Sequence, residues 1–295
     1  MPLSDVRGMV EAARIGGYAI GYFEAWNLES LQGVIDAPEE TRSPIIIAFS
    51  GDFLSRPERL TAERLSIYAA MGRAAAEEAG VPCGLIFNEC PRDDWVQQAI
   101  LAGFNLVMPV ATAEAYEDYA SRVAKLVAMA HEHGAAVEAE LGDLPCGSAG
   151  TIVAGGSSTD PQRAARFVRE TNVDLLAVSV GNVHIMIQGE KPLDLNRLKA
   201  IRREVPTPLV LHGGTGIARD SLEKAIACGV VKVNYGTYLK QRYLAAIRRK
   251  LGEERPNPHE LLGLGGEWDL LVAGRNAVRE AVLERMDWLG CCGRT

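Results

Sequence analysis

The sequence predicts a (β/α)8 TIM barrel, an α/β fold, on three observations. The chain has 295 residues, which is enough for one barrel with a large core. Eight short apolar runs of β type recur along it, and stretches that read as amphipathic helices separate them. Apolar strands that alternate with helices form a parallel sheet covered on both faces, and eight such units close into a barrel.

The eight predicted strands are Tyr18–Phe23, Ile45–Phe49, Pro82–Asn88, Leu106–Val110, Ala136–Leu141, Leu175–Val180, Pro208–His212 and Val230–Asn234. The clearest helices between them are Leu60–Glu78, Ala113–His133, Asp160–Glu170, Leu195–Glu204 and Arg219–Cys228. Capping signals support several boundaries. Asp160 and Pro161 are typical of a helix start, and Gly80 and Gly134 are typical of helix ends.

We expect a single domain over residues 1–295, with a C-terminal helical extension over about 253–295. An irregular stretch, Glu253–Asp269, leads into a final helix predicted at Val278–Leu289. A second irregular stretch, Gly142–Ser158, is rich in glycine and serine. At that length it is typical of a functional lid.

Composition limits the possible partners. The net charge of −7 argues against nucleic acid, which requires a clustered basic face. No apolar run reaches the length of a membrane span, and residues 1–10 lack a signal-peptide pattern. We therefore expect a cytoplasmic protein with no membrane partner. The six cysteines are too scattered for a disulfide framework, and we expect reduced thiols.

Polar residues end or follow most of the predicted strands. In a barrel, the C-terminal strand ends surround the active site, so these residues should converge on one pocket. They are Glu24, Ser50, Gly51, Asn88, Glu89, Glu138, Glu140, Gly181, His184, His212 and Asn234.

Two of the five histidines, His184 and His212, fall at neighbouring strand ends. A single histidine there is more often a structural residue. Two of them, with Glu89 and Glu140 nearby, favour a divalent metal site, because imidazole and carboxylate groups suit zinc and related ions.

Glycine-containing turns follow the seventh and eighth strands. Loops at these two positions commonly bind phosphate in barrels, because glycine lets backbone N–H groups approach the anion at a helix N-terminus. The residues concerned are Gly213, Gly214, Thr215, Asn234, Gly236 and Thr237.

At these motifs the sequence resembles the class II fructose- and tagatose-bisphosphate aldolase family, nearly from end to end. The most specific motifs are LVLHGGTG at Leu209–Gly216 and KVNYGTYL at Lys232–Leu239. The resemblance extends over Tyr18–Leu31, Val137–Gly142, Thr159–Phe167, Asp174–Gly181 and Val278–Arg294.

The resemblance implies an aldehyde-lyase of carbohydrate metabolism. In this family a divalent metal, usually zinc, stabilises the enediolate that forms when a C–C bond of a ketose phosphate breaks. Motif matching makes His184 and His212 metal ligands and Glu140 an accessory ligand position. The implied phosphate and substrate site comprises Gly181, Gly213, Thr215, Asn234 and Thr237, to which we add Ser50, Gly214 and Gly236. The family also forms dimers and tetramers, which implies a homodimer or homotetramer.

The sequence departs from the family where acid–base chemistry occurs. The family's third strand ends in His-Leu-Asp-His-Gly, and the aligned residues here are Ile-Phe-Asn-Glu-Cys at 86–90. Asn88 replaces the catalytic aspartate, and an amide cannot act as a general base near neutral pH. Glu89 replaces a histidine ligand, which shifts the metal preference towards Mn²⁺ or Mg²⁺ when more oxygen ligands join it. Glu24 replaces the usual asparagine of the first strand, and the start of the strand-5 loop offers only Asp143 as an acid.

We therefore predict a metal-dependent aldolase that acts on a phosphorylated ketose or keto-sugar acid other than the standard bisphosphate. His184 and His212 would hold the metal together with Glu89 or Glu140. The candidate catalytic positions are Glu89, Asn88 and Glu24, and one of the glutamates would be the base. Two alternatives stay open, namely a sugar-phosphate isomerase or epimerase and a non-catalytic sugar-phosphate-binding protein. Metal content would separate the last from the two enzymes, and product analysis would separate the enzymes.

Overall fold

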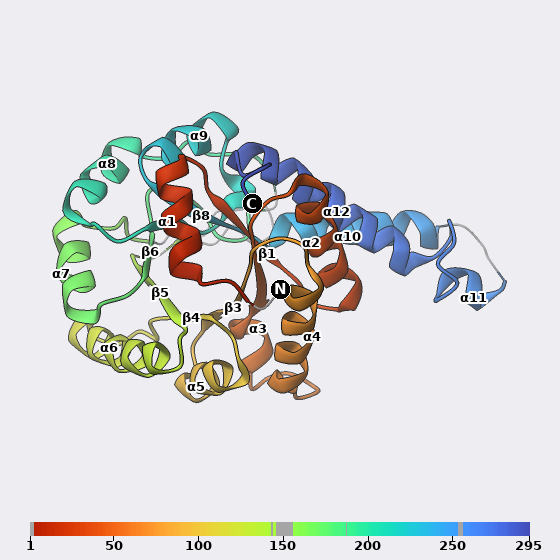
Figure 1. The fold of residues 1–295 in the computed structure, drawn as a ribbon, viewed down its shortest axis with the longest axis horizontal. Helices are drawn as coiled ribbons and strands as arrows, with labels where there is room; N and C mark the ends of the chain where they lie inside the picture. Colours follow the sequence, from red (N-terminus) through yellow and green to blue (C-terminus); the bar gives the residue numbers. More distant parts are fainter. Residues whose placement is uncertain (1–2, 143, 146–155, 187, 253–255) are drawn as a thin grey trace.

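The computed structural model describes residues 3–142, 144–145, 156–186, 188–252 and 256–295. Within them, eight parallel strands pair in sequence order from β1 to β8, and β8 pairs with β1 to close the barrel. Helices surround the strands, as Figure 1 shows. The predicted TIM barrel is therefore confirmed.

All eight predicted strands are present, with small shifts at their ends. They are β1 (Ile20–Glu24), β2 (Ile45–Ser50), β3 (Cys83–Cys90), β4 (Leu106–Pro109), β5 (Ala136–Leu141), β6 (Leu175–Val178), β7 (Leu209–Leu211) and β8 (Val230–Tyr235). The first strand starts two residues later than predicted, because Tyr18 N–H still donates to the carbonyl of Ala13 and closes the preceding helix.

The helices described are α1 (Val6–Gly16), α2 (Leu28–Thr41), α3 (Gly51–Ser55), α4 (Leu65–Glu78), α5 (Asp93–Ala102), α6 (Tyr116–Glu132), α7 (Pro161–Thr171), α8 (Leu195–Glu204), α9 (Arg219–Ala227), α10 (Thr237–Leu251), α11 (Pro258–Leu261) and α12 (Leu270–Leu289). A 3-10 turn, η2 (Gly214–Gly216), follows β7. Helix α6 begins later than predicted because Ala113 has a φ of 58°, outside the right-handed helical region. Helix α12 begins eight residues earlier than predicted, where the side chain of Asp269 caps it.

Helix α1 covers the N-terminal ends of the strands. Ser4 N–H donates to the carbonyl of Cys83 at the start of β3, and the Arg7 guanidinium donates to the carbonyl of Ala135 just before β5. Arg7 also pairs with Asp174 at 2.6 Å, one residue before β6. The polar C-terminal strand ends lie at the opposite mouth, where a ligand can enter.

The last part of the chain packs on the barrel and also projects from it. Helices α10 and α12 lie side by side and extend outward, with α11 at the far end (Figure 1). Arg275 in α12 holds α2 through two hydrogen bonds of 2.6 Å to Asp36. Near the barrel, α12 contributes Val278, Val282 and other buried residues to the core. Among the described residues, no helix combines the length and apolar character needed to cross a bilayer.

Candidate active site

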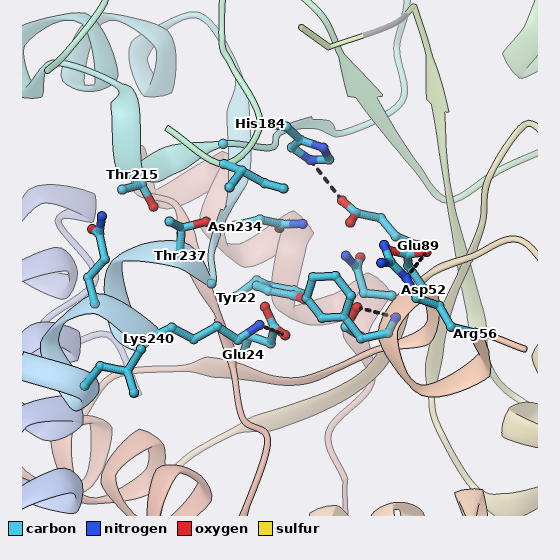
Figure 2. Close-up of a pocket in the computed structure, with 18 residues that line it drawn as sticks. Tyr22, Glu24, Asp52, Arg56, Glu89, His184, Thr215, Asn234, Thr237 and Lys240 are labelled. Atoms are coloured by element: carbon cyan, nitrogen blue, oxygen red, sulfur yellow. Dashed lines mark hydrogen bonds and ion pairs between the residues drawn. The ribbon is translucent and has the colours of Figure 1, made fainter. Parts of the chain in front are cut away.

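A cavity of about 400 Å³ opens at the C-terminal ends of the strands (Figure 2). Most of the sequence-predicted site residues line it, namely Glu24, Ser50, Asn88, Glu89, His184, Gly213, Thr215, Asn234, Gly236 and Thr237. His212 and Glu140 lie beside the lining and contact each other. Gly181 and Gly214 are not part of the lining. Gly214 packs on β8, where a Cβ would lie 2.7 Å from the Tyr235 ring.

Glu89, His184 and His212 form a cluster from β3 and from the loops after β6 and β7. One potential ligand atom from each lies within 4.8 Å of those of the other two. Glu89 Oε1 is 3.2 Å from His184 Nε2 and 3.1 Å from His212 Nδ1. The two imidazole rings stack at 5.8 Å between centroids and 5° between planes. This arrangement presents one oxygen and two nitrogen atoms around a common point.

An irregular backbone brings Glu89 into the site. In a regular strand, Asn88 and Glu89 would point to opposite faces. The pairing of β3 with β4 shifts between Phe87 and Cys90, and Glu89 has a φ of 54°, which is rare for a residue with a side chain. Both side chains consequently reach the cavity. A backbone of this kind at a ligand position is typical of functional sites.

The environment of His212 suits a cation. Its ring is almost completely buried, and its Nε2 lies 2.9 Å from Glu138 Oε1. Its Nδ1 lies 2.7 Å from Glu140 Oε2 and 3.1 Å from Glu89 Oε1, yet neither approach has hydrogen-bond geometry. A buried nitrogen without a partner, facing two carboxylates, is an arrangement that a bound divalent ion would satisfy.

The carboxylates and imidazoles of the cluster shift one another's pKa values in the direction that favours their charged forms. Burial would lower the pKa of His212, but the carboxylates of Glu140, Glu138 and Glu89 outweigh it and hold that pKa well above its ordinary value. Burial would raise the pKa of Glu89, but His184 and His212 outweigh it and hold that pKa well below its ordinary value. Glu89 is therefore ionised and available as a ligand near neutral pH.

Glu24 has different surroundings. Its Oε1 lies 2.6 Å from Lys240 Nζ in the first turn of α10, as Figure 2 shows. Burial raises the pKa of Glu24 above its ordinary value, and Lys240 opposes that shift. The other carboxylate oxygen lies against Gly236, where any Cβ would collide with it. Glu24 is thus a carboxylate in the cavity whose pKa is displaced towards neutrality.

The loops after β7 and β8 meet at the start of α10. Thr215 Oγ1 accepts a hydrogen bond of 3.2 Å from Tyr238 N–H, which joins the two loops. Helix α10 begins after Gly236, and no side chain caps it. The Nδ2 atom of Asn234 is buried and has no hydrogen-bond partner among the described residues. The backbone N–H groups at the start of this 15-residue helix, together with the Asn234 amide, suit an anion.

Sequence reasoning assigned no role to several residues of the site. Tyr22, Asp52, Arg56 and Lys240 line the cavity, and Lys232 is buried beneath it. Lys232 carried a usable signal, since a charged residue inside an apolar barrel strand requires a partner. The others had none, because their roles depend on which helix turn or loop faces the cavity.

The predicted lid falls largely outside the described residues. Asp143 and residues 146–155 are among those the structure does not describe. Pro145, a described residue of the predicted lid, accepts a hydrogen bond of 2.9 Å from His184 N–H through its carbonyl.

Comparisons with known proteins identify the family of this chain. The family model "Fructose-bisphosphate aldolase class-II" matches residues 4–294. A probable fructose-bisphosphate aldolase of Bacillus subtilis is 32% identical over 297 residues, covering 98% of this chain and 98% of that protein. A 6-phospho-5-dehydro-2-deoxy-D-gluconate aldolase of Halalkalibacterium halodurans is 33% identical over 258 residues, covering 86% and 87%. The crystal structure of the YdjI aldolase from Escherichia coli superimposes with a TM-score of 0.80 at 32% identity, covering 99% of each chain.

Proposed function

Because this chain belongs to the class-II fructose-bisphosphate aldolase family, we propose that the cavity is its active site and that Glu89, His184 and His212 hold the metal. The chain is a metal-dependent aldolase, a C–C lyase that acts on a phosphorylated sugar. The observation that carries the assignment is the buried, unpartnered Nδ1 of His212 in front of two carboxylates. Two histidines and one glutamate form a donor set used by catalytic zinc sites, so zinc is the proposed metal.

Glu140 is the accessory position in this proposal. It contacts His212 Nδ1, but it is not part of the three-residue cluster. When bound, the metal would supply Lewis-acid stabilisation of the negative charge that develops on the ketone oxygen. Additional oxygen ligation by Glu140 would favour Mn²⁺ or Mg²⁺, which makes these ions the alternatives to test.

Glu24 is the proposed base. Asn88 cannot accept a proton near neutral pH, and Glu89 is committed to the histidines. Glu24 lines the cavity, and its raised pKa brings its proton affinity closer to that needed for proton transfer. During cleavage it takes the proton of the hydroxyl group on the carbon that becomes the aldehyde. The C–C bond then breaks, its electron pair moves to the ketone half, and a proton is added there afterwards.

The two ends of the cavity suit different parts of the substrate. The phosphorylated ketone half would contact Gly213, Thr215, Asn234 and Thr237, where the anion-binding groups gather. Two ion pairs also line the cavity, Glu24 with Lys240 at 2.6 Å beside the turn that starts α10 and Asp52 with Arg56 at 2.5 Å beside α3. Since each of these cations is already neutralised by a carboxylate, this part of the lining suits hydroxyl groups better than a second phosphate.

We therefore propose a phosphorylated ketose or keto-sugar acid, rather than fructose bisphosphate, as the substrate. The Halalkalibacterium halodurans relative is named for a phosphorylated keto-sugar acid, which supports this class. Ser50 also lines the cavity, although its Oγ already accepts a hydrogen bond from Phe53 N–H.

The test is a screen of phosphorylated ketoses and keto-sugar acids with metal-stripped protein, with and without Zn²⁺, Mn²⁺ or Mg²⁺. We expect an aldehyde and a phosphorylated ketone as products, only when metal is present, and with fructose bisphosphate as a poor substrate. An isomerised product without cleavage would identify a sugar-phosphate isomerase or epimerase instead. Protein that binds a sugar phosphate but no metal, and leaves the sugar unchanged, would support the non-catalytic sugar-phosphate-binding alternative.

We also propose self-association as a homodimer or homotetramer. Leu251, Leu262 and Leu264 are exposed at and near the ends of α10 and α11, which project from the barrel. Exposed apolar side chains on a projection are typical of an interface. Light scattering after size-exclusion chromatography would give the mass, and a monomer at micromolar concentration would contradict the proposal. The cytoplasmic location and the absence of nucleic-acid or membrane partners stay predictions.

A further inference from the structure

The floor beneath the cavity contains two charged side chains with no solvent exposure. Lys232 lies in the middle of β8, and Glu138 lies in β5 across the barrel interior. Lys232 Nζ is 2.8 Å from Glu138 Oε2. Burial lowers the pKa of Lys232, and the Glu138 carboxylate opposes that shift. A buried ion pair of this kind contributes little to stability compared with apolar residues of the same volume, so its presence calls for another explanation.

The pair reaches the proposed metal ligands through Glu138. The second carboxylate oxygen, Oε1, accepts from Nε2 of His212 at 2.9 Å. With a metal bound at Nδ1, this contact would keep the remaining ring proton on Nε2, and Nδ1 lies 3.1 Å from Glu89 Oε1. Lys232 therefore acts on His212 indirectly, by holding the carboxylate that orients the ring.

The same lysine reaches the substrate half through Asn234. Lys232 Nζ donates to Asn234 Oδ1 at 2.6 Å. Because the oxygen of the amide is engaged, its nitrogen is fixed on the opposite side, and Nδ2 has no partner in the part of the chain that the structure describes. Asn234 is 7% exposed and lines the cavity, and Figure 2 shows its side chain directed into the cavity. A buried amide donor without a partner is aimed at a ligand.

We propose that Lys232 is a positioning residue that couples metal binding at His212 to ketone-half binding at Asn234. One ammonium group sets the tautomer and orientation of a metal ligand through Glu138 and the orientation of a substrate donor directly. This inference rests on the proposed function, since it takes His212 as a ligand and Asn234 as a substrate contact.

The Tyr22 ring completes the surroundings of the ammonium group, with Lys232 Nζ 4.9 Å from the ring centroid. Tyr22 is almost fully buried and pairs with Asn234 in the register of β1 and β8. The lysine is therefore held on three sides by Glu138, Asn234 and Tyr22. Since Lys232 is fully buried, turning away from these groups would leave its charge unpaired in the barrel interior.

The test compares Lys232→Met with two variants, Glu138→Gln and Asn234→Ala, which each alter one of the two contacts of Lys232. Two affinities are measured for each protein, one for Zn²⁺ by competition with a chelator and one for dihydroxyacetone phosphate by calorimetry. The wild-type values come first, and a wild type that binds neither probe would refute the proposed function rather than the coupling. Neither measurement depends on turnover.

We expect Glu138→Gln to weaken Zn²⁺ binding by roughly 10-fold to 100-fold, the usual effect of losing a carboxylate behind a histidine ligand. Asn234→Ala should weaken binding of dihydroxyacetone phosphate and leave Zn²⁺ affinity unchanged. Lys232→Met should weaken both. A folded Lys232→Met protein that keeps both affinities within about threefold of the wild type, less than the effect of one lost hydrogen bond, would overturn the proposal.

A second variant covers the possibility that Lys232→Met does not fold because Glu138 is left as an unpaired buried charge. The double variant Lys232→Met/Glu138→Gln removes both charges and keeps the volume. We expect it to fold and to bind dihydroxyacetone phosphate as weakly as Asn234→Ala does, since nothing then fixes the amide of Asn234. Wild-type affinity for dihydroxyacetone phosphate in this double variant would equally overturn the coupling.

Discussion

The carboxylate of Glu24 occupies the space that any side chain at Gly236 would need. The two residues belong to β1 and to the turn that starts α10, and they are 212 positions apart in the chain. A larger residue at 236 would push Glu24 away from Lys240, with which it pairs at 2.6 Å. The identity of position 236 is thus tied to the proposed base.

Gly236→Ala should therefore lower kcat on the order of 100-fold, the scale expected when a catalytic group is displaced by about 1 Å. Steady-state kinetics on the substrate found in the screen would measure this. Combined with Glu24→Gln, the alanine should cause little further loss, because both changes remove the same group. Additive losses would show that Gly236 acts separately, for example through phosphate.

Glu24→Gln should lower kcat by roughly 100-fold or more with little change in KM, as expected for a lost general base. In the wild type, activity should rise with pH through the raised pKa of Glu24, and this limb should vanish in the variant. A carboxyl group with a raised pKa stabilises the fold at low pH and loses that contribution as pH rises through the folded-state pKa. The Tm of the variant relative to the wild type should consequently increase from acid to neutral pH. A variant that retains the pH limb would exclude Glu24 as the base.

His184→Ala and His212→Ala should each lose bound metal, measured by elemental analysis after purification with zinc. His131→Ala is the matched control, because His131 pairs with Asp174 at 3.0 Å in the lower part of the barrel, away from the cavity. The control should keep its metal. Full metal content in both site variants would contradict the assignment of His184 and His212 as metal ligands.

Glu89→Gln should reduce both bound metal and kcat, the latter by roughly 100-fold or more, because the variant loses the ligand charge. The measurement pairs elemental analysis with kinetics. Retained metal with lost turnover would mean that Glu89, and not Glu24, is the base. Normal turnover would mean that it is neither ligand nor base.

Asn88→Asp should fail to create activity on fructose or tagatose bisphosphate. Asn88 is 3% exposed and adjacent to Glu89, so a carboxylate there would place two like charges together and raise one pKa. The Glu24–Lys240 and Asp52–Arg56 pairs, which leave no free cation for a second phosphate in this part of the lining, would also remain unchanged. Product assays on both bisphosphates would decide. Efficient cleavage would show that a single residue separates this chain from the standard activity.

The strands were predictable because barrel strands are apolar on both faces, and all eight appeared close to their predicted positions. The barrel topology predicted that Glu89 would lie near the two histidines. It did not predict the backbone conformation that turns the Glu89 side chain into the cavity. The left-handed backbone at Glu89 and the irregular pairing of β3 leave no pattern in the sequence. Lys240 was not predictable either, since it reaches Glu24 only because α10 starts at Thr237 and its first turn faces β1.

The left-handed backbone at Glu89 lowers thermal stability, whereas the glutamate side chain is required for the proposed metal site. A left-handed conformation costs a residue with a side chain on the order of 1 kcal/mol, which glycine would largely avoid. Glycine, however, offers no carboxylate to the two histidines. Selection for thermal stability alone would therefore drive this position away from glutamate, and a thermostabilised form of the protein has to be screened for metal content as well as for its melting temperature.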